Sequence, residues 1–286
     1  MLTEDELELS ADVEAVLVSH NPRGMARLRA QLQPGYCARA AQQLWDRRSQ
    51  TILIGTGFPV ANTFETDGPA GAMALYDALA RLGADVWLAG PPSLAAVLAP
   101  THQVLALTAA NADTQQRHCD DSLARIQPDL IVAIEVPGAA QDGRYYNIRG
   151  IDISAQCGNF ESFMRTQGCP TIGIGDGGNE AGMGNIDARA ADLPIVQAAG
   201  KCSELVIADV SNWGAYALVG FLGRWSKEPF LQDLRDRPLL EWLTDHGAVD
   251  GVTHEPTATE DGLALGSGNR LIDTLLRVFQ PQKDTP

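Results

Sequence analysis

The chain has 286 residues, a formal net charge of −15 at pH 7 and 45% hydrophobic residues. This hydrophobic content is enough to bury the core of one large α/β domain. The acidic balance argues against nucleic acid, which needs a basic surface, and no basic amphipathic segment suggests a membrane surface. Five scattered cysteines without a CxxC pair argue against a structural zinc site and fit free thiols in a reducing compartment.

The first ten residues, MLTEDELELS, are acidic and lack the apolar run of a secretory signal or the basic character of a transit peptide. No apolar stretch of the sequence is long enough to span a bilayer. We therefore expect a cytoplasmic protein.

Helical periodicity opens the chain and predicts helices at 9–20 and 38–48. Short apolar runs then alternate with helical segments. Strands are predicted at 51–57, 84–90, 103–107, 129–136, 171–175 and 204–210, and helices at 71–83, 231–247 and 269–279. This alternation predicts an α/β fold, a doubly wound and mostly parallel sheet with helices on both faces. We expect a single domain over residues 1–286, with N-terminal (1–50) and C-terminal helical additions.

Polar loops follow the first, fourth, fifth and sixth predicted strands, at the sheet edge where such folds bind ligands. The loop after the fifth strand, GDGGNEAGMG, sets Asp176, Asn179 and Glu180 among glycines, and the loop after the first carries Glu65 and Asp67. Such acids suit a hard divalent cation or a substrate ammonium, but they also cap helices well, and each loop alone leaves both interpretations open. If the loops converge, a cation becomes the better explanation, because unbalanced acids repel one another.

A dinucleotide site is the alternative for the glycine loop. Gly173, Gly175 and Gly178 satisfy GxGxxG after a strand, and Asp209 ends the next strand. The acids of the loop would repel a pyrophosphate, however, and the sequence has no GxxxxGK[ST] motif. We expect no nucleotide, and keep a nucleotide-dependent enzyme as an alternative.

The loop after the fourth strand carries Tyr145, Tyr146 and Asn147 beside Arg144 and Arg149. An arginine in this position could hold a carboxylate through two hydrogen bonds, although surface packing explains the tyrosines equally well.

Ser211 and Asn212 lie where a strand passes into a helix, so a helix cap is the first interpretation and a substrate contact the second. The five histidines show no metal-ligand spacing, and no GxSxG motif or activated cysteine points to covalent acyl chemistry.

Read in chain order, the motifs TGFPV, ETDGPAGAMAL, DGRYYNIRGIDIS, GIGDGGNEAGMG, VSNWGAYAL and VDGVT resemble the D-glutamate cyclase family, over about 51–263. The likeness is to the C-terminal catalytic region of its eukaryotic mitochondrial member and to bacterial relatives. It implies a lyase that converts D-glutamate to 5-oxo-D-proline and water, with a divalent metal, manganese as first choice. The eukaryotic member carries a further N-terminal domain, which we expect this chain to lack.

The resemblance leads to a hypothesis for the site. Asp67, Asp176 and Glu180 would bind the metal, which polarises the γ-carboxylate, while Glu65 or Glu180 takes the ammonium proton. The α-carboxylate would be held by Arg149 or Arg144. The expected catalytic residues are Glu65, Asp67, Asp176 and Glu180, and the expected substrate contacts are Thr56, Tyr145, Tyr146, Asn147, Arg149, Gly177, Gly178, Asn179, Ser211 and Asn212.

The expected partner is therefore a small amino acid, with no nucleic acid and no membrane, and a homo-oligomer is left open. A module that binds D-glutamate or 5-oxoproline without turnover is the remaining alternative.

Overall fold

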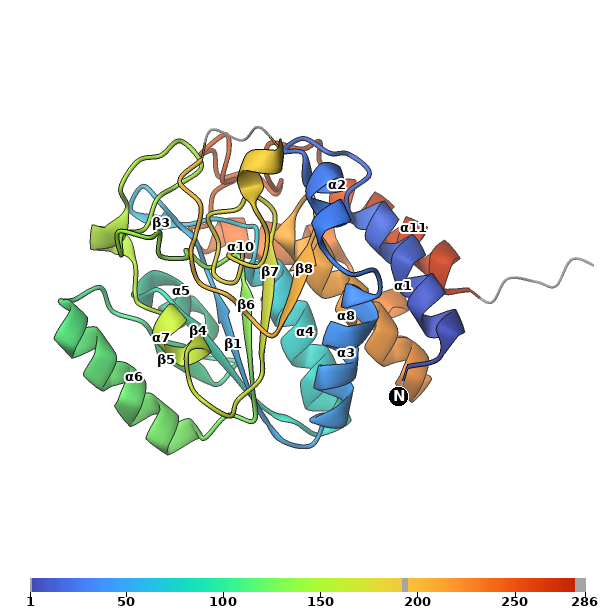
Figure 1. Cartoon of the computed structure of the whole chain (residues 1–286), viewed down its shortest axis with the longest axis horizontal. Coiled ribbons are helices and arrows are strands. Elements are labelled where there is room, and N and C mark those ends of the chain that lie inside the picture. Colours follow the sequence, from blue (N-terminus) through green and yellow to red (C-terminus); the bar gives the residue numbers. More distant parts are fainter. Residues whose placement is uncertain (1, 192–194, 281–286) are drawn as a thin grey trace, which may run out of the picture.

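The computed structural model describes residues 2–191 and 195–280. Its centre is a six-stranded sheet in the order β5-β4-β1-β6-β7-β8, in which every pairing is parallel (Figure 1). The strands are β1 (Thr51–Thr56), β4 (Asp85–Gly90), β5 (Val104–Ala106), β6 (Leu130–Ile134), β7 (Thr171–Gly175) and β8 (Glu204–Ile207). All six predicted strands are confirmed. Two short strands, β2 (Pro59–Val60) and β3 (Thr63–Phe64), form a separate antiparallel pair.

The helices surround this sheet. They are α1 (Glu4–Leu17), α2 (Met25–Leu28), α3 (Tyr36–Asp46), α4 (Pro69–Leu82), α5 (Pro92–Leu98), α6 (Ala112–Ile126), α7 (Glu161–Met164), α8 (Ser211–Ser226), α9 (Phe230–Asp233), α10 (Asp236–Asp245) and α11 (Ser267–Phe279). The single helix predicted at 231–247 was wrong, because α9 ends and α10 begins within that range. Pro238 explains the break, since proline fits the first turn of α10 but not the interior of one long helix.

Alternate residues of the strands feed two cores. In β1, Ile52 and Ile54 pack with the core that includes α3, α4 and α8, whereas Leu53 packs with Phe160 and Phe163 on the opposite face. Figure 1 shows α6 and α7 on one side of the sheet and α4, α8 and α3 on the other, with α1 and α11 outside them. Both faces are therefore covered, as the continuous apolar strands predict.

The strand order places a crevice at a defined point. The chain moves from β1 outward to β4 and β5, returns to β6 beside β1, and then moves outward the other way to β7 and β8. In such sheets the loops at the carboxyl ends diverge where the direction reverses, here between β1 and β6. The four polar loops follow β1, β6, β7 and β8, which are adjacent strands, so the topology brings these loops together.

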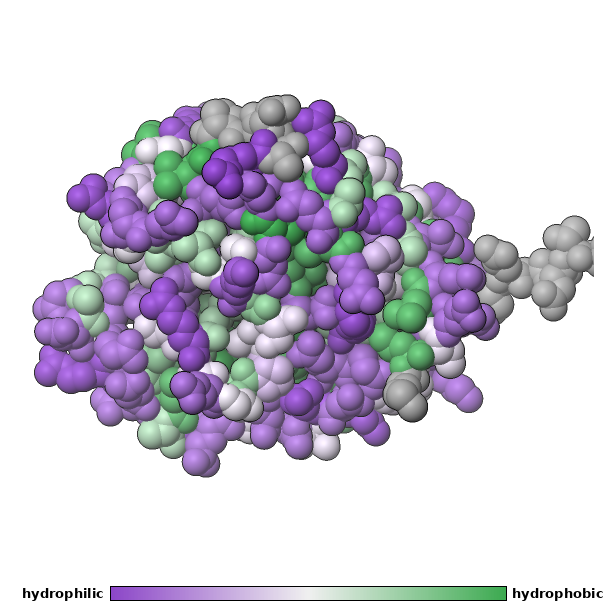
Figure 2. Space-filling view, viewed as in Figure 1, coloured by the Kyte–Doolittle hydropathy of each residue, from purple (hydrophilic) through white to green (hydrophobic). Residues whose placement is uncertain are grey.

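On the face drawn in Figure 2 the surface is mostly hydrophilic, with a few small hydrophobic areas, in keeping with the acidic composition. Within the two described ranges, no helix combines the length and the apolar character that a membrane span requires.

Candidate functional site

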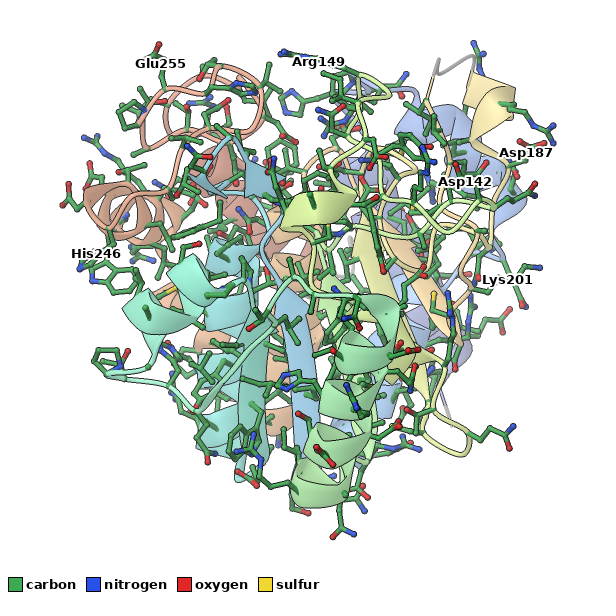
Figure 3. The ribbon with its side chains drawn as sticks, turned by 90° about the vertical axis from the view of Figure 1, so that its left-hand side faces the viewer. Asp142, Arg149, Asp187, Lys201, His246 and Glu255 are labelled. Atoms are coloured by element: carbon green, nitrogen blue, oxygen red, sulfur yellow. The ribbon has the colours of Figure 1, made fainter. Side chains whose placement is uncertain are left out.

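A cavity of about 220 Å³ opens at this crevice. Its acidic lining comes from four separate parts of the chain: the segment after β3 (Glu65), the end of β6 and the loop after it (Glu135 and Asp152), the loop after β7 (Asp176 and Glu180) and the C-terminal loop before α11 (Asp261). Figure 3 shows Arg149, which also lines the cavity, at the end of the molecule where these loops gather. The structure therefore collects the acids of distant loops, as the convergence argument required.

Three buried carboxylates form the centre of the cluster. Oxygen atoms of Asp67, Glu135 and Asp176 all lie within 4.8 Å of one another, and none of the three residues is more than 6% exposed. Glu135 has a positive φ of 49°, which is uncommon for a residue with a side chain and is often found at functional sites. Its Oε2 accepts a hydrogen bond of 2.6 Å from the Ser211 hydroxyl.

Asp67 also caps a helix. Its carboxylate accepts the backbone N–H groups of Ser211 at 2.9 Å and Asn212 at 2.7 Å, in the first turn of α8, and that of Gly68 at 2.8 Å. The Asn212 amide oxygen in turn accepts the N–H groups of Gly68 and Gly71 at the start of α4. Asp67, which precedes α4, thus caps α8, and Asn212, in the first turn of α8, caps α4. These contacts lock together the segments that follow β1 and β8. Ser211 and Asn212 serve this capping, and both are fully buried.

The guanidinium group of Arg23, from the N-terminal segment (residues 1–50), reaches the cluster. Arg23 Nη2 lies 2.7 Å from Asp176 Oδ2 and 2.5 Å from Asp261 Oδ2, and Arg23 Nε donates to the Asp176 carbonyl oxygen at 3.0 Å. This segment was predicted as a helical addition, and Arg23, Asp261 and Glu135 were not among the predicted site residues. The one signal for Glu135 was its place near the end of a predicted strand, 129–136, at the ligand-binding edge.

The loop that carries Asp261 is held by two other acids. The Asp250 carboxylate accepts backbone N–H groups from Val252, Thr253 and Gly262. Glu260 accepts the Trp213 indole N–H at 2.6 Å and the Asn212 amide at 2.8 Å. The C-terminal loop is therefore tied to the start of α8, directly under the cluster.

The proton affinities of these acids follow from burial and mutual repulsion. Burial, with the charge of Asp261, raises the pKa of Asp67 to about 7, although backbone N–H groups oppose the change. Burial, followed by the charges of Glu180 and Glu65, raises the pKa of Glu135 well above its usual range. Burial also raises the pKa of Asp176, against the opposing charge of Arg23. Burial and mutual repulsion therefore favour the protonated forms of these carboxyl groups.

The donor set fits a hard divalent cation. Asp67, Glu135 and Asp176 offer only carboxylate oxygens, the ligands that Mg²⁺, Mn²⁺ and Ca²⁺ prefer. A bound cation would offset the repulsion that keeps these groups protonated. The buried trio therefore has the donor chemistry of a divalent-cation site.

Glu65 and Glu180 lie beside the trio. Burial, with the charges of Asp261 and Asp67, raises the pKa of Glu65 well above its usual range. A Cβ atom at Gly251 would collide with Glu65 Oε2, so only glycine leaves room for this carboxylate. Glu180 Oε2 accepts the Gly178 N–H at 2.7 Å. Glu180 does not join the three-carboxylate group among the described residues.

Of the predicted substrate contacts, four line the cavity: Asn147, Arg149, Gly177 and Asn179. Asn147 Oδ1 accepts the N–H groups of Arg149 and Ile151, both at 3.0 Å, which shapes the turn that presents Arg149. The Asn179 amide donates to the Tyr146 carbonyl oxygen at 3.0 Å and joins the loops after β6 and β7.

The other predicted contacts lie outside the lining: Thr56, Tyr145, Tyr146, Gly178, Ser211 and Asn212. The Tyr145 hydroxyl donates to Asn159 and that of Tyr146 donates to Asp142. Arg144 is exposed, 3.6 Å from Asp152, and does not line the cavity either.

The glycine loop lacks the surroundings of a dinucleotide site. Gly173 and Gly175 lie within β7, and among the described residues no α-helix separates β7 from β8. A phosphate would thus find no helix N-terminus there. A Cβ at Gly175 would lie 2.9 Å from Glu180 Oε2, so this glycine admits a carboxylate beside the strand. The geometry speaks against the nucleotide alternative.

Comparison with known proteins adds a family to this geometry. A family model described as "D-glutamate cyclase-like, C-terminal" matches residues 13–276. The chain belongs to this family. The resemblance drawn from the ordered motifs is thereby confirmed, and the matched range includes Arg23 as well as the cluster.

Among family relatives, the mitochondrial D-glutamate cyclase of Homo sapiens is 31% identical over 206 residues, which cover 59% of this chain and 32% of the human protein. The chain thus spans about a third of the length of this curated relative.

Solved structures are more distant. An exopolyphosphatase-related protein from Bacteroides fragilis matches with a TM-score of 0.43 and 11% identity, over 86% of this chain and 57% of that one. Exonuclease RecJ bound to manganese matches with a TM-score of 0.41 and 18% identity, over 86% and 48%. Since these likenesses are weak, the chemistry of the site rests on the residues of this chain.

Proposed function

We propose that the chain is a D-glutamate cyclase, a lyase that forms 5-oxo-D-proline and water from D-glutamate. The observation that carries the proposal is the buried carboxylate trio, two members of which, Glu135 and Asp176, line a small cavity with Arg149, in a chain of this family. Pockets for drug-sized ligands span roughly 300–1,000 Å³, so a cavity of about 220 Å³ suits a five-carbon amino acid better than a nucleotide.

The proton balance of the reaction suits buried acids. The α-ammonium loses two protons as the amide bond forms, and the γ-carboxylate oxygen leaves with two protons as water. The site therefore needs a group that takes a proton from nitrogen and returns it to oxygen. Glu65 lines the cavity, and its raised pKa makes its carboxylate a stronger base than that of an ordinary glutamate, which suits a group that takes up and returns a proton.

The remaining roles follow from position. Asp67, Glu135 and Asp176 would hold a divalent cation, with Mn²⁺ as first choice, and this cation would supply Lewis-acid polarisation of the γ-carboxylate. Arg149, in the cavity lining, would hold the α-carboxylate. A cavity of this small size would favour the folded, five-membered geometry of the substrate, which lowers the entropic part of the barrier.

A chiral product assay tests the proposal. Purified protein is incubated with D-glutamate or L-glutamate, with Mn²⁺ or with EDTA, and both enantiomers of 5-oxoproline are quantified. We expect product from D-glutamate with Mn²⁺ and loss of product with EDTA. No product from either enantiomer contradicts the proposal, and D-glutamate binding without turnover assigns a binding module instead. Glu65→Gln should remove turnover, while Asp152→Asn, an exposed acid at the cavity mouth, should retain it.

A further inference from the structure

The turn at residues 19–24, between α1 and α2, is held in a fixed shape by Asp209. Asp209 Oδ2 accepts the backbone N–H groups of His20 at 2.7 Å and Asn21 at 2.8 Å. Asn21 has a φ of 51°, a conformation that asparagine tolerates better than most residues, and its side chain accepts the N–H of Ala26. The His20 ring lies against Trp213, with centroids 5.3 Å apart. The turn is thus fastened to the end of β8 and the start of α8.

Arg23 projects from this turn into the site. Its Nη2 donates to the Asp209 carbonyl oxygen at 2.9 Å and also pairs with the carboxylates of Asp176 and Asp261. Its Nε donates to the Asp176 carbonyl oxygen, so one guanidinium holds both the backbone and the side chain of Asp176. Burial opposes its charge, but the charges of Asp176 and Asp261 raise the pKa of Arg23 well above its ordinary value, and it stays protonated.

The hydrogen bonds and ion pairs of Arg23 indicate that it holds protein groups in place. Because Nε and Nη2 are already occupied by protein oxygens, a substrate carboxylate does not find a free fork on this residue, in contrast to Arg149, which makes no side-chain ion pair among the described residues. Asp209 is absent from the cavity lining, and its side chain bonds to the backbone of the turn, so its carboxylate acts on the site through the turn.

We propose that Arg23 is a positioning residue for Asp176, and that Asp209 acts through Arg23 by fixing the 19–24 turn. The N-terminal segment is then part of the active site. The activity readout of this inference rests on the proposed function, so its test includes a readout that is independent of turnover.

The chain offers a matched control. Arg39, in α3 of the same segment, pairs with Glu204 through Nε–Oε2 and Nη2–Oε1 distances of 2.9 Å each. Glu204 begins β8, at the amino end of the sheet, whereas Asp209 follows its carboxyl end. Arg39→Gln thus removes a guanidinium–carboxylate pair that ties the segment to β8 without touching the site.

The experiment compares Arg23→Gln, Asp209→Ala, their double variant and Arg39→Gln. We expect kcat to fall about 100-fold for Arg23→Gln, with KM changed by less than about 3-fold, because a misplaced catalytic group costs rate rather than substrate affinity. The double variant should be no slower than Arg23→Gln, because Asp209 acts through Arg23. Arg23→Lys and Asp209→Asn, which keep the charge and an acceptor oxygen respectively, should each recover part of kcat. Arg39→Gln should stay within about 2-fold of wild type.

The second readout is the electron paramagnetic resonance spectrum of bound Mn²⁺. Displacement of Asp176 should change the spectrum in Arg23→Gln and leave it unchanged in Arg39→Gln. If wild type shows no turnover of D-glutamate, this contrast still supports the positioning role while the proposed function fails. A spectrum and kcat equal to wild type in Arg23→Gln, losses that multiply in the double variant, or an equal kcat loss in Arg39→Gln would each overturn the inference.

Discussion

Asp67 should make the stability of the metal-free protein depend on pH in a direction opposite to that of ordinary salt-bridged acids. Its pKa is raised from 3.8 to about 7, chiefly by burial. Between these values the folded protein keeps a proton that the unfolded chain has lost. Stability therefore falls as pH rises through this window, and is fully present only below about pH 4.

The magnitude follows from the shift. About three pKa units at about 1.4 kcal/mol each correspond to about 4 kcal/mol over the whole window. Between pH 4.5 and 7.5, Asp67 should account for about 3 kcal/mol of this loss. Asp67→Asn removes the titration, and should also cost about 1 kcal/mol at any pH, because its amide nitrogen cannot accept the Ser211 N–H.

Urea unfolding in EDTA, followed by tryptophan fluorescence at several pH values, measures the effect as a difference between wild type and Asp67→Asn. We expect wild type to be the more stable of the two at pH 4.5 and to lose this advantage by pH 7.5. Mn²⁺ at about 100 times its Kd should then restore about 2.7 kcal/mol to wild type at pH 7.5. If the two proteins lose stability in parallel as pH rises, Asp67 does not titrate in this window and the reasoning is refuted.

Three further variants test the other parts of the site. Asp176→Asn should lower kcat by about 1,000-fold or more with unchanged far-ultraviolet circular dichroism, and near-normal turnover would contradict its place in the metal site. Glu135→Gln should weaken Mn²⁺ binding in calorimetry by at least about tenfold, since it removes one of three carboxylates; unchanged affinity would exclude it as a ligand. Arg149→Gln should raise KM about tenfold or more through loss of a charge-assisted hydrogen bond to the substrate. Arg144→Gln, at a residue outside the cavity lining, should leave KM unchanged. Equal KM values in these two variants would exclude Arg149 as the residue that holds the α-carboxylate.

The sheet could be predicted from the sequence because its strands are short apolar runs, buried on both faces. Its mostly parallel pairing follows from the alternation of strands and helices along the chain. Helix α8 was harder to recognise. Residues 211–223 are buried on every side, and apolar or small residues all round a helix leave no periodicity. Only the junction at Ser211 and Asn212 marked where it begins.

The site was predictable in part. The glycine-rich loop and its acids were identified from composition, and the topology brought them together. Arg23 and Asp261 could not be identified, because Arg23 meets Asp176 across 153 positions of sequence and Asp261 across 238. Neither lies in a motif, and both are contributed by segments that look like additions to the fold. The residue whose charge balances a buried cluster is brought there by tertiary contacts. A pattern along the sequence does not reveal such contacts.

The hydrogen bonds of Asp67 are compatible with both roles expected of it, helix cap and metal ligand. An ionised carboxylate offers about four acceptor positions. In Asp67, Oδ1 accepts the N–H groups of Gly68 and Asn212, and Oδ2 accepts that of Ser211. One position on Oδ2 is left over, which is what a single metal bond needs. The cap fixes the carboxylate, and a bound metal would use the remaining lone pair, so that the positive end of α8 and the cation would both stabilise the ionised form of this buried acid.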